Sequence, residues 1–287
     1  MIWLLLDAGN STLKWMLTAG AAGEAPLGLE MPDVLVQGML AIEDPALDAT
    51  LAAELSRAFP HGSKSAGASV PSAAWGCAVA GADRIEAIEH AVRKTELPAV
   101  HWFGAAAQFD HRGVQLRNGY RDPAQLGSDR WHALIGARAR FAHGPLIVVN
   151  AGTATTVDAI DEHGRFVGGV IAPGVELMRA SLARGTARLP LATGNYRHHP
   201  DNTDDAIRTG ILDAQIGLIA QRVQRLSDLA GGDVQTVLSG GNAALLHALL
   251  QAQARLGKMA LEPDLVLLGL WHRARAQNIE ALANGTG

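Results

Sequence analysis

The order of apolar and polar residues predicts alternating strands and helices along the chain. Residues 2–6 form a short apolar run that ends at a polar Asp-Ala-Gly-Asn turn, and apolar character resumes over 13–18. This pattern is typical of two strands joined by a turn. Further along, a helix over 44–59 is predicted by apolar residues at i, i+4 spacing, namely Leu47, Leu51, Leu55 and Phe59.

The same two patterns recur through the rest of the chain. Apolar runs bounded by turn residues predict further strands over 74–79, 100–103, 146–149, 156–160, 165–171 and 234–238. Amphipathic spacing predicts helices over 83–95, 128–141, 175–184 and 204–229. A loop is expected over 61–72, a further helix after Asn242, and a closing element over 263–270. This alternation indicates an α/β layer arrangement.

One arrangement occurs twice: an apolar strand, a Gly-containing polar turn and a second strand that forms a hairpin. It occupies residues 2–18 and again 146–160. The repetition predicts two similar α/β domains, over 1–144 and 145–287, with the boundary near the sequence His143-Gly144-Pro145.

Composition and charge narrow the functional class. Of the 287 residues 48% are hydrophobic, which argues against disorder, and 24 basic against 28 acidic residues give a net charge of −4. A broad basic face for nucleic acid is therefore not expected. Asp7 ends the first apolar run, and no run is long enough to cross a bilayer. We expect a soluble cytoplasmic protein in which the single cysteine, Cys77, is a small buried side chain.

Three Gly-rich turns follow apolar strands and point to phosphate binding. They begin at Asp7, Asn150 and Ser239. Glycine lets the backbone approach an anion closely, and neighbouring N–H and hydroxyl groups can donate to it. Neither a G-x-x-x-x-G-K-[ST] loop nor a strand-linked G-x-G-x-x-G sequence is present. The turns therefore predict a phosphate-binding protein of another nucleotide-binding class.

The spacing of six motifs resembles the actin, Hsp70 and sugar-kinase superfamily, and within it the type III pantothenate kinases. The motifs are Asp7-x-Gly9-Asn10-Ser11-x-x-Lys14-Trp15, Tyr120-x-x-Pro123-x-x-Leu126-Gly127-x-Asp129-Arg130-Trp131, Gly152-Thr153-Ala154-Thr155-Thr156-x-Asp158, Gly168-Gly169-x-Ile171-x-Pro173-Gly174, Thr186-Ala187-x-Leu189-Pro190 and Ser239-Gly240-Gly241. The resemblance implies two ribonuclease H-like (actin-like) domains with an ATP cleft between them. It also implies ATP-dependent phosphorylation of pantothenate to 4′-phosphopantothenate, the first step of coenzyme A biosynthesis, by a homodimer.

The resemblance assigns ATP and cation ligands to the Gly-rich turns. Asp7 would hold Mg²⁺ through water, which agrees with the cost of an ionised carboxylate at the end of a buried strand. An Asx turn or a cap is the alternative for Asp7, and a solvated strand lysine is the alternative for Lys14. Many family members carry Asp at the position of Asn150, where it helps to bind K⁺ or NH₄⁺. The implied ATP contacts are Asp7, Ala8, Gly9, Asn10, Ser11, Thr12, Leu13, Lys14 and Thr153.

The resemblance places the catalytic base at Asp129. The attacking alcohol must lose its proton, and a positioned carboxylate can accept it. Without the surrounding motif, Asp129 would be read as a helix-start residue stabilised by the helix dipole. A structural salt bridge is the alternative for Arg130, which otherwise offers a fork of donors to an anion. The implied contacts with pantothenate are Tyr120, Gly127, Ser128, Asp129, Arg130 and Thr186.

Two other functions remain open at this point. A non-catalytic nucleotide-binding regulator of transcription would bind ATP without transferring phosphate, and a kinase for another small alcohol would accept a different substrate. Four arginines are expected to be exposed helix charges, namely Arg138, Arg140, Arg273 and Arg275. Trp131, Leu134 and Trp271 are expected in a core or a subunit interface.

Overall fold

The computed structural model describes residues 1–19, 31–59, 71–252 and 256–283, so most of the predicted loop at 61–72 lies outside the described residues. The chain divides into two compact units. The first contains residues 1–116 and 120–142 and the helix that begins at Leu265, and the second contains 117–119 and 143–264. The change of unit after Ala142 lies next to the predicted boundary, but the C-terminal helix differs from the prediction because it returns to the first unit.

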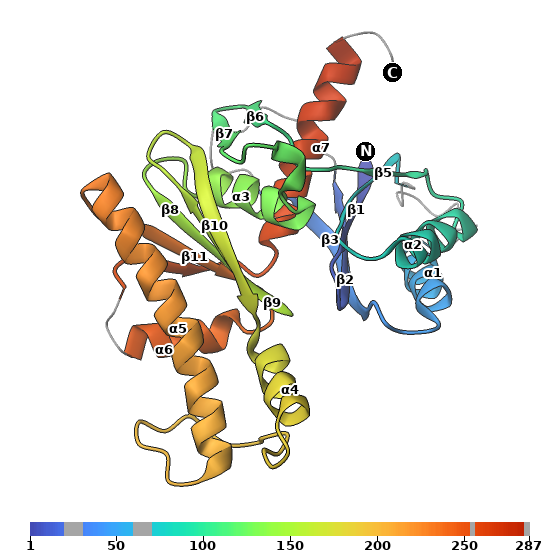
Figure 1. Cartoon of the computed structure of the whole chain (residues 1–287). Coiled ribbons are helices and arrows are strands. Elements are labelled where there is room, and N and C mark those ends of the chain that lie inside the picture. Colours follow the sequence, from blue (N-terminus) through green and yellow to red (C-terminus); the bar gives the residue numbers. More distant parts are fainter. Residues whose placement is uncertain (20–30, 60–70, 253–255, 284–287) are drawn as a thin grey trace. The chain divides into compact units, whose positions relative to one another are not determined.

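The first unit is built on a five-stranded sheet with the order β3-β2-β1-β4-β5 (Figure 1). β1 pairs antiparallel with β2, and β2 pairs antiparallel with β3, whereas β4 lies parallel to both β1 and β5. The predicted hairpin over 2–18 is thereby confirmed. The strands are β1 (Ile2–Ala8), β2 (Thr12–Ala19), β3 (Asp33–Ala41), β4 (Ala73–Ala78) and β5 (Val100–Trp102).

Side chains of β1 alternate between two cores on opposite faces of this sheet. Leu4 and Leu6 pack in the same core as the buried residues of α1 (Leu47–Ala58) and α2 (Ala82–Lys94). Trp3 and Leu5 face the other way, onto α7 (Leu265–Ala283). Asp7 continues the series of Trp3 and Leu5, so its side chain belongs to the face that α7 covers.

α3 (Ser128–Arg140) packs closely on α7 within the first unit. The approach depends on two glycines: a Cβ added to Gly269 would overlap the carbonyl oxygen of His132, and one added to Gly136 would overlap that of Leu265. Trp131 and Leu134 are buried in this region, as is Trp271, so the expectation of a core position is confirmed for all three. The crossing fixes the axis of the helix that bears Asp129.

The structure corrects the expectation of exposed charges for all four arginines, since Arg140 and Arg273 are half-buried and the other two are buried. Arg138 and Arg275 are only 3% and 4% exposed, whereas exposed helix charges were expected. The Arg275 guanidinium lies 4.6 Å from the centre of the Trp271 ring, a cation–π geometry. Amphipathic spacing could not reveal this burial, because it arises from the packing of two helices that lie far apart in the sequence.

The second unit repeats the strand arrangement of the first. Five strands of the second unit lie in the order β10-β9-β8-β11-β12, which matches β3-β2-β1-β4-β5 in both order and direction. The predicted hairpin at 146–160 is confirmed, and the strands predicted over 156–160 and 165–171 pair antiparallel with each other. These strands are β8 (Leu146–Ala151), β9 (Ala154–Ile160), β10 (Arg165–Pro173), β11 (Gln235–Ser239) and β12 (Met259–Leu261). The short strand β6 (Gln108–His111) and most of β7 (Val114–Asn118) belong to the first unit.

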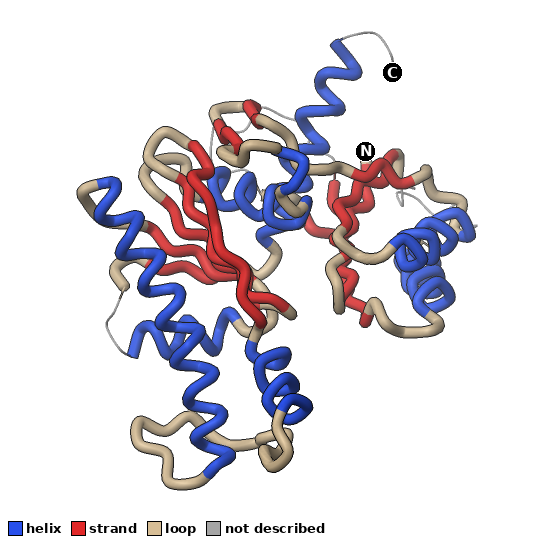
Figure 2. Tube along the Cα trace, viewed as in Figure 1, coloured by secondary structure: helices blue, strands red, loops and turns tan. Residues whose placement is uncertain are grey.

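Three helices share one core with this second sheet. α5 (Thr203–Ala230) runs along the strands in Figure 1 and contributes the largest set of apolar side chains, from Ile207 to Leu226. α4 (Val175–Gly185) and α6 (Ala243–Ala252) complete the core. Figure 2 shows the long irregular segment that joins α4 to α5.

The elements that the sequence analysis missed are short or exposed. None of the residues of β3 is buried, so its sequence shows no alternation of buried and exposed positions, and β12 has only three residues. The short strands β6 and β7 and the 3₁₀ turn Pro123–Gln125 also lacked a pattern. The C-terminal helix α7 is longer than the predicted closing element, and no described helix is both long and apolar enough to span a membrane.

Two buried histidines should make the stability of the first unit depend on pH. Burial lowers the pKa of His132 to about 4 and that of His272 to about 4. An unfolded histidine takes up its proton near pH 6.5, so below that pH the unfolded state binds more protons than the folded state. We expect the free energy of unfolding to fall by roughly 1 kcal/mol per pH unit for each histidine as the pH drops from about 6.5 towards 4. Denaturant unfolding near pH 7 and near pH 5 would measure this, and equal stabilities would contradict it.

Candidate active site

The first Gly-rich turn joins β1 to β2 in the first unit. Asp7 lies opposite Lys14 in the ladder of these two strands, and both residues are half-buried. Asn10 and Ser11 are exposed at the tip of the hairpin, and Thr12 begins β2. Ala8 and Leu13 are fully buried in the core, so only their backbone groups could meet an ATP phosphate. The hairpin therefore presents polar groups along one edge and anchors itself with apolar ones.

Cys77 lies beside Asp7 on the parallel strand β4. The two residues are paired in the β1–β4 register, and the Cys77 thiol donates a hydrogen bond to Asp7 Oδ1 over 3.8 Å. The thiol is completely buried, which raises its pKa well above the usual value, and the charges of Asp7 and Asp129 raise it further. The protonated thiol therefore contacts the Asp7 carboxylate and is also affected by the charge of Asp129, the two acids to which the sequence analysis gave different roles.

Asp129 lies in the first turn of α3, and the start of that helix is tied to β4. The Ser128 hydroxyl donates to the carbonyl oxygen of Ala78 over 2.8 Å, and the Arg130 backbone N–H donates to Asp129 Oδ1 over 2.8 Å. Burial raises the pKa of Asp129, and the Arg130 N–H and guanidinium oppose that shift. A Cβ on Gly127 would lie 2.6 Å from Asp129 Oδ1, so this glycine leaves room for the carboxylate. A carboxylate with a raised pKa is better suited to accept a proton.

Arg130 and Tyr120, both expected to contact substrate, contact each other. Arg130 Nη1 donates to the Tyr120 hydroxyl oxygen over 3.2 Å, and the guanidinium lies 5.9 Å from the centre of the Tyr120 ring. Arg130 is 5% exposed and Tyr120 is half-buried. Tyr120 thus holds the Arg130 guanidinium beside Asp129, and the guanidinium could bind a planar anion there.

The other Gly-rich turns meet in the second unit. Asn150 is paired with Ser239 in the register of β8 and β11, and Thr153 is exposed in the turn that follows β8. Gly240 has a φ of +95°, and a Cβ there would lie 2.7 Å from both Asn150 Oδ1 and the carbonyl of Ala151. This position therefore requires glycine on two grounds, conformation and space. The second and third turns form one cluster of backbone polar groups.

Thr186 lies away from that cluster. It caps the C-terminal end of α4, where its hydroxyl donates to the Leu182 carbonyl oxygen over 2.9 Å, whereas the N-terminal end of the helix follows the Thr153 turn. At 1.5 Å per residue, the length of α4 separates Thr186 from that turn by about 16 Å. Within the second unit, the structure therefore groups Thr153 with Asn150 but not with Thr186.

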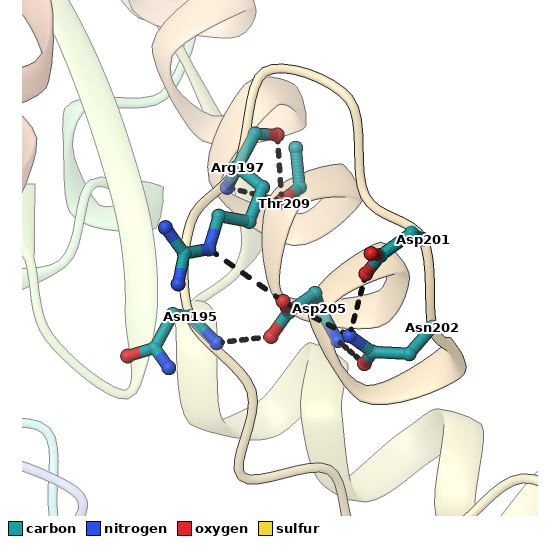
Figure 3. Close-up of polar contacts among 6 residues, drawn as sticks. All are labelled: Asn195, Arg197, Asp201, Asn202, Asp205 and Thr209. Carbon is teal, nitrogen blue, oxygen red and sulfur yellow. Dashed lines mark hydrogen bonds and ion pairs between the residues drawn. The ribbon is translucent and has the colours of Figure 1, made fainter.

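Thr186 begins the irregular segment that precedes α5, and this segment is fixed by side chains of that helix. Asp205 Oδ1 accepts the backbone N–H of Asn195 over 2.7 Å, and the Thr209 hydroxyl bonds both the N–H and the carbonyl of Arg197 (Figure 3). Asn202 caps α5 by accepting the N–H of Asp205 over 2.9 Å. These anchors were not foreseen, because they are ordinary capping residues in sequence and acquire their role only from the fold of the loop.

The structure thus places most of the expected residues in two groups. Asp7, the first hairpin, Tyr120 and the sequence Gly127-Ser128-Asp129-Arg130 belong to the first unit, and Asn150, Thr153 and Thr186 belong to the second. Cys77 and Ala78 were missed as participants. The available signal was their place at the carboxyl end of a predicted strand, where ligand-binding residues gather in α/β sheets.

Comparison with known proteins identifies relatives along nearly the whole chain. The family model described as type III pantothenate kinase matches residues 3–225. A type III pantothenate kinase of Aromatoleum aromaticum is 40% identical over 250 residues, covering 86% of this chain and 89% of that protein. One from Laribacter hongkongensis is 37% identical over 272 residues, covering 95% and 98%.

Solved structures show that the fold is that of the actin-like ATPases. A Baf family protein from Campylobacter jejuni has a TM-score of 0.52 at 16% identity, covering 96% of this chain and 98% of that one. The activator of 2-hydroxyisocaproyl-CoA dehydratase from Clostridium difficile, solved with bound ADPNP, has a TM-score of 0.50 at 12% identity, covering 99% and 98%. With the motifs, the repeated sheet and these relatives in agreement, the chain belongs to the type III pantothenate kinase family.

Proposed function

We propose that Asp129 is the general base of the reaction that this type III pantothenate kinase carries out, the ATP-dependent phosphorylation of pantothenate in coenzyme A biosynthesis. The γ-phosphoryl group would pass to the primary hydroxyl of pantothenate. The observation that best supports a catalytic Asp129 is its environment: the carboxylate is half-buried at the start of α3, burial raises its pKa, and Arg130 and Tyr120 lie beside it. The family of the chain indicates the reaction. In this cluster the Asp129 carboxylate can accept a proton, and the neighbouring Arg130 guanidinium can bind an anion.

Asp129 would accept the hydroxyl proton of pantothenate as its oxygen attacks the γ-phosphorus. The bond from phosphorus to the ATP bridging oxygen breaks as the new P–O bond forms, and ADP leaves. The Arg130 backbone N–H on Asp129 Oδ1 fixes one carboxylate oxygen, so the other is available to the alcohol. The Arg130 guanidinium, steadied by Tyr120, would bind the pantothenate carboxylate or the transferred phosphoryl group.

ATP would be bound by the Gly-rich turns, with Asp7 as the carboxylate for its Mg²⁺. The residues fit this ion: Mg²⁺ commonly takes one or two carboxylates together with substrate phosphates and water, and Asp7 is a half-buried carboxylate at the end of β1. Bound Mg²⁺ would neutralise charge on the phosphates. Among the chain's own groups, Asn10, Ser11, Thr12, Lys14 and Thr153 would donate to phosphate oxygens.

Asn150 would contribute a neutral oxygen to a K⁺ or NH₄⁺ site. Its amide oxygen lies close to the backbone at Gly240, and amide and carbonyl oxygens are suitable K⁺ ligands. Replacing it by a carboxylate, Asn150→Asp, should lower the K⁺ concentration for half-maximal activity about tenfold through charge attraction. Activity would be titrated with KCl at ionic strength held constant with choline chloride. An unchanged K⁺ requirement would exclude Asn150 from the cation site.

The direct test of the proposed function is an assay of the purified protein with Mg-ATP, K⁺ or NH₄⁺, and pantothenate. We expect 4′-phosphopantothenate and ADP in equal amounts. ATP binding without product would favour a nucleotide-binding regulator, and product from another alcohol in a panel would favour a different kinase. Sedimentation of the same preparation would test the homodimer that the family resemblance predicts.

A further inference from the structure

Cys77 lies where the two carboxylates of the candidate active site can be held relative to each other. Its thiol is fully buried and donates to Asp7 Oδ1 over 3.8 Å, and the charges of both Asp7 and Asp129 act on it. The alternation of β1 and β4 turns both Asp7 and Cys77 towards the sheet face that is covered by α7. The thiol therefore lies on the same side of the sheet as the Asp7 carboxylate.

The next residue of β4, Ala78, contacts the start of the helix that bears Asp129. The carbonyl oxygen of Ala78 accepts the Ser128 hydroxyl over 2.8 Å, one residue before Asp129. Consecutive residues of one strand therefore contact Asp7 through a side chain and the start of α3 through the backbone. A strand buried on both faces is a rigid element, so these contacts define the spacing between the two acids.

The repeated sheet provides an internal comparison. Ser239 in β11 occupies the position equivalent to Cys77, opposite Asn150 in the register of β8. Its hydroxyl donates instead to the carbonyl oxygen of Pro263 over 3.2 Å. The shared topology therefore does not itself direct the side chain at this position towards the end of the first strand. The contact of Cys77 with Asp7 is a feature of the first unit alone.

We propose that Cys77 is a positioning residue, whose thiol holds the Asp7 carboxylate in one orientation for Mg-ATP while Ala78 holds the helix that bears Asp129. This inference rests on the proposed function. The side-chain carboxylate of Asp rotates in a broad torsional well, so each hydrogen-bond donor restricts its orientation further. A neutral thiol supplies that donor without adding a charge that would compete with Mg²⁺ for the carboxylate.

The test compares Cys77→Ala with Cys77→Ser, because these two variants leave nearly the same space and differ in the donor. The shift in melting temperature caused by ATP would be measured over a series of Mg²⁺ concentrations, without pantothenate. We expect Cys77→Ala to raise the Mg²⁺ concentration for half of the shift about three- to tenfold, and Cys77→Ser to stay within about twofold of the wild type. Thr18→Ala is the matched control, since Thr18 is a buried polar residue on β2 of the same sheet, whose hydroxyl donates to its neighbouring carbonyl.

Steady-state kinetics then separate positioning from general loss of structure. Cys77→Ala should raise the KM for Mg-ATP more than it lowers kcat, and Cys77→Ser should restore the KM. Equal Mg²⁺ dependence in Cys77→Ala, Thr18→Ala and the wild type would overturn the inference, as would equal defects in the Ala and Ser variants. The melting experiment contains no pantothenate, so failure of the proposed reaction would be recognised separately, as normal Mg-ATP binding by a protein that makes no product.

Discussion

Asp129→Asn should lower kcat for pantothenate phosphorylation by about two to four orders of magnitude, the usual contribution of a positioned general base. The amide keeps the shape of the carboxylate and can still accept the Arg130 N–H, but it cannot take up the proton of the alcohol. Binding of Mg-ATP should change little, because the proposed nucleotide contacts lie elsewhere. Product formation and ATP-induced shifts in melting temperature would be measured on the same protein.

The matched control for Asp129→Asn is Asp83→Asn. Asp83 is also in the first turn of a helix of the first unit, α2, but it is exposed. If Asp129 only stabilised its helix through the dipole, both variants would lose a few tenths of a kcal/mol of stability and neither would lose turnover. Because burial raises the pKa of Asp129, the acidic limb of the wild-type pH–kcat/KM profile should lie above the usual range of an aspartate pKa. If the Asp129→Asn variant retained its turnover, Asp129 would not be the general base.

The fold was predictable where the chain repeats a strong local pattern. The hairpins at 2–18 and 146–160 are continuous apolar strands followed by Gly-rich turns, and both form as expected. The long helix α5 deviates from its prediction by one residue at each end. In each of these elements local propensity and burial favour the same structure.

In the candidate site, the sequence motifs predicted which residues take part but not the contacts between them. Asp129 and Arg130 were predicted from a motif. The hydrogen bond from the Arg130 backbone N–H to Asp129, and that from the Arg130 side chain to Tyr120, depend on how α3 begins. The position of Cys77 beside Asp7 follows from the pairing of β1 with β4, and β2, β3 and α1 lie between these strands in the sequence. The register between two strands that are distant in the sequence cannot be read from a short stretch of residues. Cys77 could therefore be predicted as buried but not as a partner of Asp7.

Gly269→Ala should cost about 3 kcal/mol of the stability of the first unit, because the new methyl group would overlap the His132 carbonyl oxygen and force α3 and α7 apart. Turnover should fall as well, since α3 bears Asp129. The melting temperature of the variant, with and without Mg-ATP, would measure the first effect, and the pantothenate assay would measure the second.

Gly210→Ala provides a control of opposite sign. Gly210 lies on the exposed side of α5, and a Cβ there would meet nothing within 4 Å. Alanine is the better helix former, so this variant should gain roughly 0.5–1 kcal/mol. Helix propensity alone would make the two substitutions equivalent, and only the close approach of α3 to α7 makes them differ in sign. Equal melting temperatures for Gly269→Ala and Gly210→Ala would therefore mean that α3 is not held against α7 through these glycines, and the basis for the position of Asp129 would have to be sought at Ser128 and β4 instead.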